Sequence, residues 1–156
     1  AIFVPDTLEN SFSVLQYIAD SDYLKGVQLL APAYWDDPVS IRGYGQLTDK
    51  AIYVSPFFVK SKNPDVKEFV KAYEEAYEQQ PGILAAQGYD AARLLEKAYI
   101  SQLESDKTSA SQKILNIVEF QGVSGLMKIQ ENGEIERRLS IVRLKRGRGV
   151  EIFRAR

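Results

Sequence analysis

Ala1-Ile2-Phe3-Val4-Pro5 is a short apolar run that ends at a proline, and it sets the pattern for the first third of the chain. The runs Val27–Leu30 and Ala51–Ser55 repeat it, and the last of them is also closed by a proline, Pro56. Short apolar runs bounded by turn residues are typical of strands buried on both faces. The sequence therefore predicts three buried strands within residues 1–56.

Helical signals separate these runs. Asp6 and Glu9 have the spacing of a capping box, which predicts a helix over about Leu8–Ala19. Asp37-Pro38 is a cap followed by proline at the first helical position, and it predicts a short helix. Strands that alternate with helices indicate an α/β fold, layered, with a mostly parallel sheet and flanking helices.

Two further helices are expected after the third strand. Asn63-Pro64 repeats the cap-and-proline signal, and Pro81-Gly82 separates its helix from a longer one over about Ile83–Leu103. The tyrosines of this part are expected in the core or at a hinge, and Tyr89-Asp90 is a candidate hinge contact. The expected inward face of the longer helix is Leu84, Tyr89, Ala92, Leu95 and Tyr99.

The last thirty residues have a β pattern. Leu126–Gln130 and a strand near Arg137–Leu144 flank Asn132-Gly133, a strong hairpin signal. Residues 137–156 hold 8 basic residues and one acid, a charge of +7, whereas residues 1–136 hold 12 basic and 20 acidic, a charge of −8. A basic tail can bind nucleic acid or acidic lipid. Apolar residues alternate with these charges, however, which favours a basic-edged C-terminal β-hairpin.

Composition excludes several kinds of chemistry. The 156 residues contain no Cys and no His, so thiol catalysis, His-based triads and His-ligated zinc are excluded. A net charge of −1 does not indicate a nucleic-acid partner. No metal-ligand spacing or cofactor motif is found, so no cofactor, metal or enzymatic activity is expected. The apolar opening without Met indicates a fragment of a longer protein; the alternative is a mature domain that begins on a strand.

Six blocks, taken in order, resemble the C-terminal half of type I periplasmic binding proteins, the family of branched-chain amino acid receptors that serve ABC importers. The blocks at Phe3–Asp6 and around Trp35 resemble most the branch of receptor-like lipoproteins called penicillin-binding protein activators. The six blocks are Ala1–Asp6, Gly26–Leu30 with Tyr34–Pro38, Ala51–Phe58, Asn63-Pro64 with Phe69-Val70 and Tyr73, Pro81 with Ala85–Ala92, and Phe120–Gly125 with Glu131–Glu134.

The resemblance implies a two-lobed receptor that closes over a small solute, an amino acid or related metabolite, for ABC-type uptake or sensing. Residues 1–56 would be a distal-lobe segment, 57–125 the return helices of the first lobe, and 126–156 the C-terminal β strands. The implied partner is the membrane permease of an ABC importer. The implied location is the periplasm, and the lipoprotein branch implies a lipid anchor at the missing N-terminus. A lobe separated from its other half would expose apolar surface, which favours a homodimer of the fragment.

The site is expected where the parallel strands end, because ligands of open α/β sheets bind beyond the carboxyl ends of the strands. Tyr34-Trp35 is either an aromatic shelf for the ligand or a plug at the side of the domain. Asp6 either bonds the ligand or only caps its helix. The candidate ligand-binding residues are Asp6, Thr7, Ala33, Tyr34, Trp35 and Phe57.

One position departs from the amino acid receptors. These receptors commonly place an acid after the second strand, where it pairs with the ammonium of the ligand, and that position falls at or beside Ala33. Asp36 and Asp37 are nearby, but Asp37 has the position of a helix cap. The departure favours an alternative function, a receptor-like lipoprotein domain that docks on a cell-wall synthase and binds no metabolite.

Overall fold

The computed structural model describes residues 1–100 and 109–154, which form two compact units. Unit 1 contains residues 1–55 and 139–154, and unit 2 contains residues 56–138. The chain therefore passes between the units twice, after Ser55 and after Arg138. The segment expected at 126–156 is divided by the second passage, so its strands belong to both units. The expected polar linker and the end of the helix before it, at residues 101–108, lie outside the described residues.

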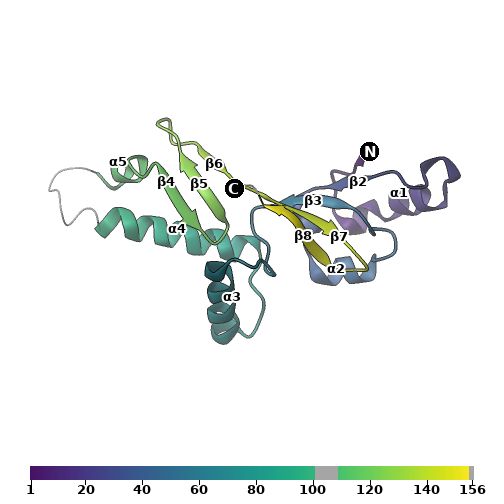
Figure 1. The fold of residues 1–156 in the computed structure, drawn as a ribbon, viewed down its shortest axis with the longest axis horizontal. Coiled ribbons are helices and arrows are strands. Elements are labelled where there is room, and N and C mark those ends of the chain that lie inside the picture. Colours follow the sequence, from purple (N-terminus) through teal and green to yellow (C-terminus); the bar gives the residue numbers. More distant parts are fainter. Residues whose placement is uncertain (101–108, 155–156) are drawn as a thin grey trace. The chain divides into compact units, whose positions relative to one another are not determined.

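Unit 1 is built on a five-stranded sheet with the order β1-β2-β3-β7-β8. The first three strands are mutually parallel, as expected for an α/β fold, and β7 and β8 are antiparallel. The expected C-terminal hairpin is confirmed: the basic tail pairs with the sheet through β3 instead of forming an arm (Figure 1). The strands are β1 (Ile2–Phe3), β2 (Leu29–Ala31), β3 (Ile52–Ser55), β7 (Ser140–Leu144) and β8 (Gly149–Arg154).

Helices α1 (Leu8–Asp20) and α2 (Pro38–Gly43) lie beside this sheet (Figure 1). Short 3₁₀ turns, η1 (Asp22–Leu24) and η2 (Ala33–Trp35), precede and follow β2. Asp37 caps α2 as expected, since its carboxylate accepts from the Ser40 N–H at 2.7 Å.

The expected capping box of α1 is wrong. Thr7, not Asp6, is the N-cap, and its hydroxyl oxygen accepts from the Asn10 N–H at 3.3 Å. The Glu9 side chain does not return to the cap; it accepts a hydrogen bond from the Ser40 hydroxyl on α2 at 3.1 Å. Glu9 therefore links two helices, and Asp6 is left outside α1.

Unit 2 combines three helices with a three-stranded antiparallel sheet of order β4-β5-β6. The helices are α3 (Pro64–Tyr77), α4 (Ile83–Ile100) and α5 (Ala110–Leu115). The strands are β4 (Glu119–Gly122), β5 (Gly125–Ile129) and β6 (Ile135–Arg137). The strand expected near 137–144 is confirmed over Ser140–Leu144, which is β7, but its start is misplaced: Arg137 is the last residue of β6 in unit 2, and β7 begins at Ser140 in unit 1.

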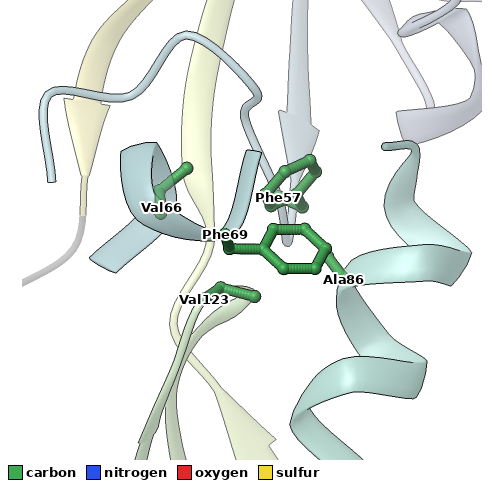
Figure 2. Packing of buried hydrophobic residues seen from close by; sticks show 5 residues of the cluster. All are labelled: Phe57, Val66, Phe69, Ala86 and Val123. Carbon is green, nitrogen blue, oxygen red and sulfur yellow. The ribbon is translucent and has the colours of Figure 1, made fainter. Parts of the chain in front are cut away.

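A compact apolar cluster holds α3, α4 and the β4–β5 turn together. Figure 2 shows Phe57, Val66, Phe69, Ala86 and Val123 directed toward one another from these elements and from the segment after β3. The Phe57 and Phe69 rings meet edge to face, with their centroids 5.8 Å apart. Edge-to-face contact is a favourable arrangement for aromatic rings, so it adds to the apolar burial.

The expected inward face of α4 is wrong within this chain. The buried positions are Ala86, Asp90 and Ala98, whereas Leu95 is 55% exposed. Both sides of α4 carry apolar or small residues, so periodicity alone does not identify the side that packs on unit 2. We name the exposed side the α4 stripe; it consists of Leu84, Gly88, Ala91, Leu95 and Tyr99.

Among the described residues, no helix is both long and apolar enough to cross a membrane.

Candidate functional site

The carboxyl ends of β1 and β2 form the candidate site, because parallel strands end at the same edge of a sheet. Ile2 pairs with Leu29 and Leu30 pairs with Ile52, which fixes this edge. The Tyr34 hydroxyl donates to the Pro5 carbonyl oxygen at 3.1 Å, and the Trp35 Nε1–H donates to the Asp6 carbonyl oxygen at 2.6 Å. We call residues 5–7 and 33–36 the rim. These two bonds join segments that are 29 residues apart in sequence.

Asp6 presents its carboxylate to solvent at the rim. Its Oδ1 accepts from the Asn10 side-chain amide at 3.0 Å and from the Thr7 N–H at 2.7 Å. These two hydrogen bonds, the Asn10 bond above all, hold the pKa of Asp6 below its ordinary value of 3.8. Asp6 is therefore ionised at neutral pH, and the Asn10 amide fixes the direction of its negative charge.

The aromatic pair of the rim separates into two roles. Tyr34 is 55% exposed, although its hydroxyl is bonded to Pro5. Trp35 has no exposed surface and its only polar atom is bonded to Asp6. This corrects the expectation that Trp35 forms part of a ligand shelf: its burial makes it a support of the rim. Ala33 begins η2 and is partly buried.

Phe57 does not belong to this group of residues. It lies in unit 2, in the cluster with Phe69 and Val123, and is 3% exposed. A ring enclosed by its own core has no surface to offer a ligand, so the expectation of a ligand contact at Phe57 is corrected. The error arose because the apolar run through Phe58 continues past the point at which the chain leaves unit 1.

A hydrogen bond at the rim was missed in the sequence. The buried hydroxyl of Tyr53, on β3, donates to the Asp36 carboxylate at 2.6 Å. Burial, followed by the nearby Asp36 charge, raises the pKa of Tyr53 far above its usual value. The bond fixes Asp36 against the sheet, which ties the loop after β2 to the neighbouring strand. The alternation of β3 predicts that Tyr53 faces inward, but only coordinates could identify Asp36 as its partner.

A second hollow lies at the opposite edge of the same sheet, where the parallel strands begin. Its volume is about 1040 Å³, and its walls come from α1, the end of α2 and the β7–β8 turn. Phe12 and Tyr44 line it with their rings 5.9 Å apart, and Arg42 and Arg146 contribute positive charge. Asp20 and Asp49 balance these charges. No motif in the sequence indicates this hollow, which depends on the return of the β7–β8 turn to α2.

Among residues 1–100 and 109–154, no group of three or more acidic side chains has an arrangement that could hold a metal ion. The rim offers instead two carboxylates, Asp6 held by Asn10 and Asp36 held by Tyr53, together with the exposed Tyr34 side chain and backbone groups. These groups can bind a solute through charge, apolar contact and hydrogen bonds.

Comparison with solved structures shows the fold. A protein from Rhodospirillum rubrum described as a branched-chain amino acid ABC transporter matches 97% of this chain and 44% of its own, with 21% identity and a TM-score of 0.84. A leucine-binding protein from Thermotoga maritima matches 98% of this chain and 43% of its own, with 23% identity and a TM-score of 0.69. A benzoate-bound solute-binding protein from R. palustris matches 94% and 45%, with 23% identity and a TM-score of 0.61.

The chain thus spans less than half the length of these structural relatives. None of the curated proteins compared with it matches. The sequence profile of a family described as periplasmic binding protein matches residues 2–149, almost the whole chain. The rim at the ends of β1 and β2, the two-unit architecture and this match agree, and the chain belongs to the periplasmic binding protein family.

Proposed function

We propose that this chain is part of a two-lobed periplasmic receptor that reversibly captures a small solute at the rim of unit 1. The observation that carries the proposal is the joining of the two loops by the Tyr34 and Trp35 hydrogen bonds, which brings Asp6 and Tyr34 to one surface. Ligands of open α/β sheets bind at this edge. Structural relatives named for leucine and benzoate support a small, partly apolar solute.

Asp6 supplies the negative charge for a ligand ammonium group that Ala33 cannot supply. The loop after β2 carries no acid at Ala33, but the Trp35 bond holds the loop after β1 against it, so the Asp6 carboxylate lies at the same rim. An ionised carboxylate fixed by Asn10 is suited to an ammonium group. Tyr34 offers its exposed side chain to the apolar part of the solute. The proposed solute is an amino acid with an apolar side chain.

The α4 stripe supports the proposal that the complete receptor extends beyond this chain. Leu84, Leu95 and Tyr99 are exposed in a row on one side of α4, with Gly88 and Ala91 between them. Exposed apolar rows of this kind mark surfaces that another element covers. The structural relatives are more than twice as long as this chain, which supports a further α/β part as the covering element.

The partners and location of the complete protein follow from the family. The proposed partner is the membrane permease of an ABC importer, the proposed location is the periplasm, and a lipid anchor at the N-terminus of the complete protein belongs to the same proposal. The proposed function includes no catalysis. A homodimer of this chain through the α4 stripe and docking on a cell-wall synthase are the alternatives, and the latter predicts that no solute binds.

A matched pair of solutes tests the proposed function. Leucine and 4-methylpentanoate share the aliphatic body and the carboxylate but differ in the ammonium group. We expect leucine to raise the melting temperature of the complete receptor and 4-methylpentanoate to raise it less. Asp6→Asn should weaken leucine binding at least about fivefold, because it removes one partner of a charge pair, and should leave 4-methylpentanoate unaffected.

Asp22→Asn is the matched control, because Asp22 is an exposed acid of unit 1 that lies in η1, away from the rim. It should bind leucine as the wild type does. A flat response to amino acids and related small solutes would contradict the proposal and favour docking on a cell-wall synthase. Equal weakening by Asp6→Asn and Asp22→Asn would remove Asp6 from the site.

A further inference from the structure

Asp90 is a buried acidic residue of α4 that is not part of the rim, and 1% of its surface is exposed. Its Oδ1 accepts from the Val123 N–H at 2.8 Å, and its Oδ2 accepts from the Ser124 N–H at 2.8 Å and from the Ser124 hydroxyl at 2.5 Å. The Arg137 guanidinium donates to the same hydroxyl oxygen at 2.5 Å. One carboxylate thus holds both residues of the β4–β5 turn by charge-assisted bonds.

The turn is shaped to receive this carboxylate. Gly122 and Gly125 pair across the hairpin and enclose the two-residue loop Val123-Ser124. A Cβ atom at Gly122 would lie 2.3 Å from the Asp90 Oδ2, closer than side-chain atoms approach one another. Only glycine at this position leaves room for the Asp90 carboxylate.

The other side of the turn lies against the two places where the chain enters and leaves unit 2. Gly125 has a φ of +106°, and a Cβ there would lie 2.6 Å from the Arg138 carbonyl oxygen and 3.9 Å from that of Pro56. The Arg138 N–H donates to the Leu126 carbonyl oxygen at 3.0 Å. Pro56 is the first residue of unit 2 after one passage, and Arg138 is the last before the other.

Apolar contact makes a second connection to the first passage. Val123, at the tip of the turn, packs in the cluster with Phe57, which follows Pro56 directly (Figure 2). The turn is thus joined to the entering segment through Val123 and to the leaving segment through Gly125 and Leu126. Asp90 is the group that fixes the turn from within α4.

We infer that Asp90 is a positioning residue of the hinge: it makes the β4–β5 turn a rigid support for both passages between the units. Movement between the units is then confined to the few residues around Ser55-Pro56 and Arg138-Leu139. Loss of the Asp90 carboxylate frees the turn, and both passages lose their common support. The inference goes beyond solute capture and is tested without any solute.

The absence of Cys allows a clean distance measurement. Spin labels are placed at Tyr23→Cys in unit 1 and Lys67→Cys in unit 2, both exposed positions, in the full chain. Pulsed dipolar spectroscopy then reports the width of the distance distribution between the units. We expect Asp90→Asn to broaden this distribution and to speed hydrogen exchange of the Val123 and Ser124 amides at least about tenfold, because their acceptor is weakened.

Ile129→Ala is the matched control. Ile129 is buried at the other end of β5, so its truncation destabilises unit 2 without contacting the turn. It should leave the width unchanged. Broadening by Ile129→Ala equal to that of Asp90→Asn would overturn the inference, since general loosening of unit 2 would then explain the effect. An unchanged width in Asp90→Asn would overturn it as well.

Ser124→Ala keeps the test decisive if Asp90→Asn does not fold. It removes the hydroxyl that bridges Asp90 and Arg137 but leaves both backbone donors in place. It should broaden the distribution in the same direction and to a smaller extent, and an unchanged width would contradict the inference. Failure of leucine binding would overturn the proposed function and leave these outcomes unaffected.

Discussion

Replacement of Trp35 by Phe should destabilise unit 1 by about 2–4 kcal/mol, although the residue lies at the rim. The substitution removes a hydrogen bond and leaves a void. The Asp6 carbonyl oxygen loses the donor that lies 2.6 Å from it in a part-buried hydrogen bond, which costs about 1–3 kcal/mol. The smaller ring leaves a void in a fully enclosed site, which costs roughly 1 kcal/mol more.

Tyr34→Phe is the matched control for this prediction. It also removes one hydrogen bond between the two loops, but the Tyr34 hydroxyl bonds Pro5 at an exposed position, where water replaces the partner. We expect a cost below about 1 kcal/mol. The two substituted side chains therefore lie in the same loop but differ in burial.

The assay must report on unit 1 alone, because two units need not unfold together. The Val4 N–H donates to the Leu30 carbonyl oxygen at 2.9 Å between β1 and β2, and its hydrogen exchange reports the stability of this sheet. Trp35→Phe should speed this exchange by one to three orders of magnitude more than Tyr34→Phe does. Equal rates in the two variants would refute the assignment of Trp35 as the buried support of the rim.

Further predictions concern the core of unit 2, the α4 stripe and the two residues with a shifted pKa. Phe57→Ala should cost unit 2 about 3–5 kcal/mol, whereas Leu95→Gln on the α4 stripe should change its stability by less than about 0.5 kcal/mol; denaturant unfolding compares the two. Asn10→Ala should raise the pKa of Asp6 toward 3.8, as followed by carboxyl NMR. The wild-type pKa is depressed, so the stabilisation from Asp6 is present above pH 3.8 and is lost as pH falls through the lower, folded pKa. Tyr53 has a raised pKa, so the fold favours its protonated hydroxyl, and this stabilisation is lost as pH rises above the unfolded value of 10.0. The absorbance of the Tyr53 phenolate should therefore appear only as unit 1 unfolds. In Tyr53→Phe, the stability of unit 1 should no longer fall for this reason as pH rises above 10.0.

The sequence was sufficient to predict elements whose ends carry local chemistry. Asn63-Pro64 and Asp37-Pro38 mark the starts of α3 and α2, and the structure begins both helices at the proline. The alternation of the basic tail likewise predicts the β hairpin that β7 and β8 form. In each case the residues that determine the element lie within a few positions of one another, so the local sequence is enough to predict it.

The errors occur where distant residues decide. The alternation around Arg137–Leu144 continues without a break, yet the chain changes unit between Arg138 and Leu139. Both sides of α4 are apolar, and the choice of packed side depends on Asp90, which bonds a turn 33 residues away. Acid residues are seldom buried without partners, and those partners are invisible in a local pattern.

The same limit applies to the candidate site. Asp6, Thr7 and Tyr34 can be placed at one edge of the sheet from strand order alone. Tyr34 and Trp35 have different roles because the loop encloses only the Trp35 ring. The role of Glu9 depends on the position of α2, whose Ser40 it contacts. Such contacts are set by packing between elements, so only coordinates reveal them.

The Trp35 indole gives the most direct test of solute capture at the rim, because its Nε1–H bonds the Asp6 carbonyl oxygen. In a proton–nitrogen correlation spectrum of the complete receptor, leucine should shift this indole resonance together with the amides of residues 6–7 and 33–34. The same experiment with 4-methylpentanoate should move them less. Leucine-induced shifts centred on Arg42 and Arg146 instead, or no shifts at all, would contradict capture of an amino acid at the rim.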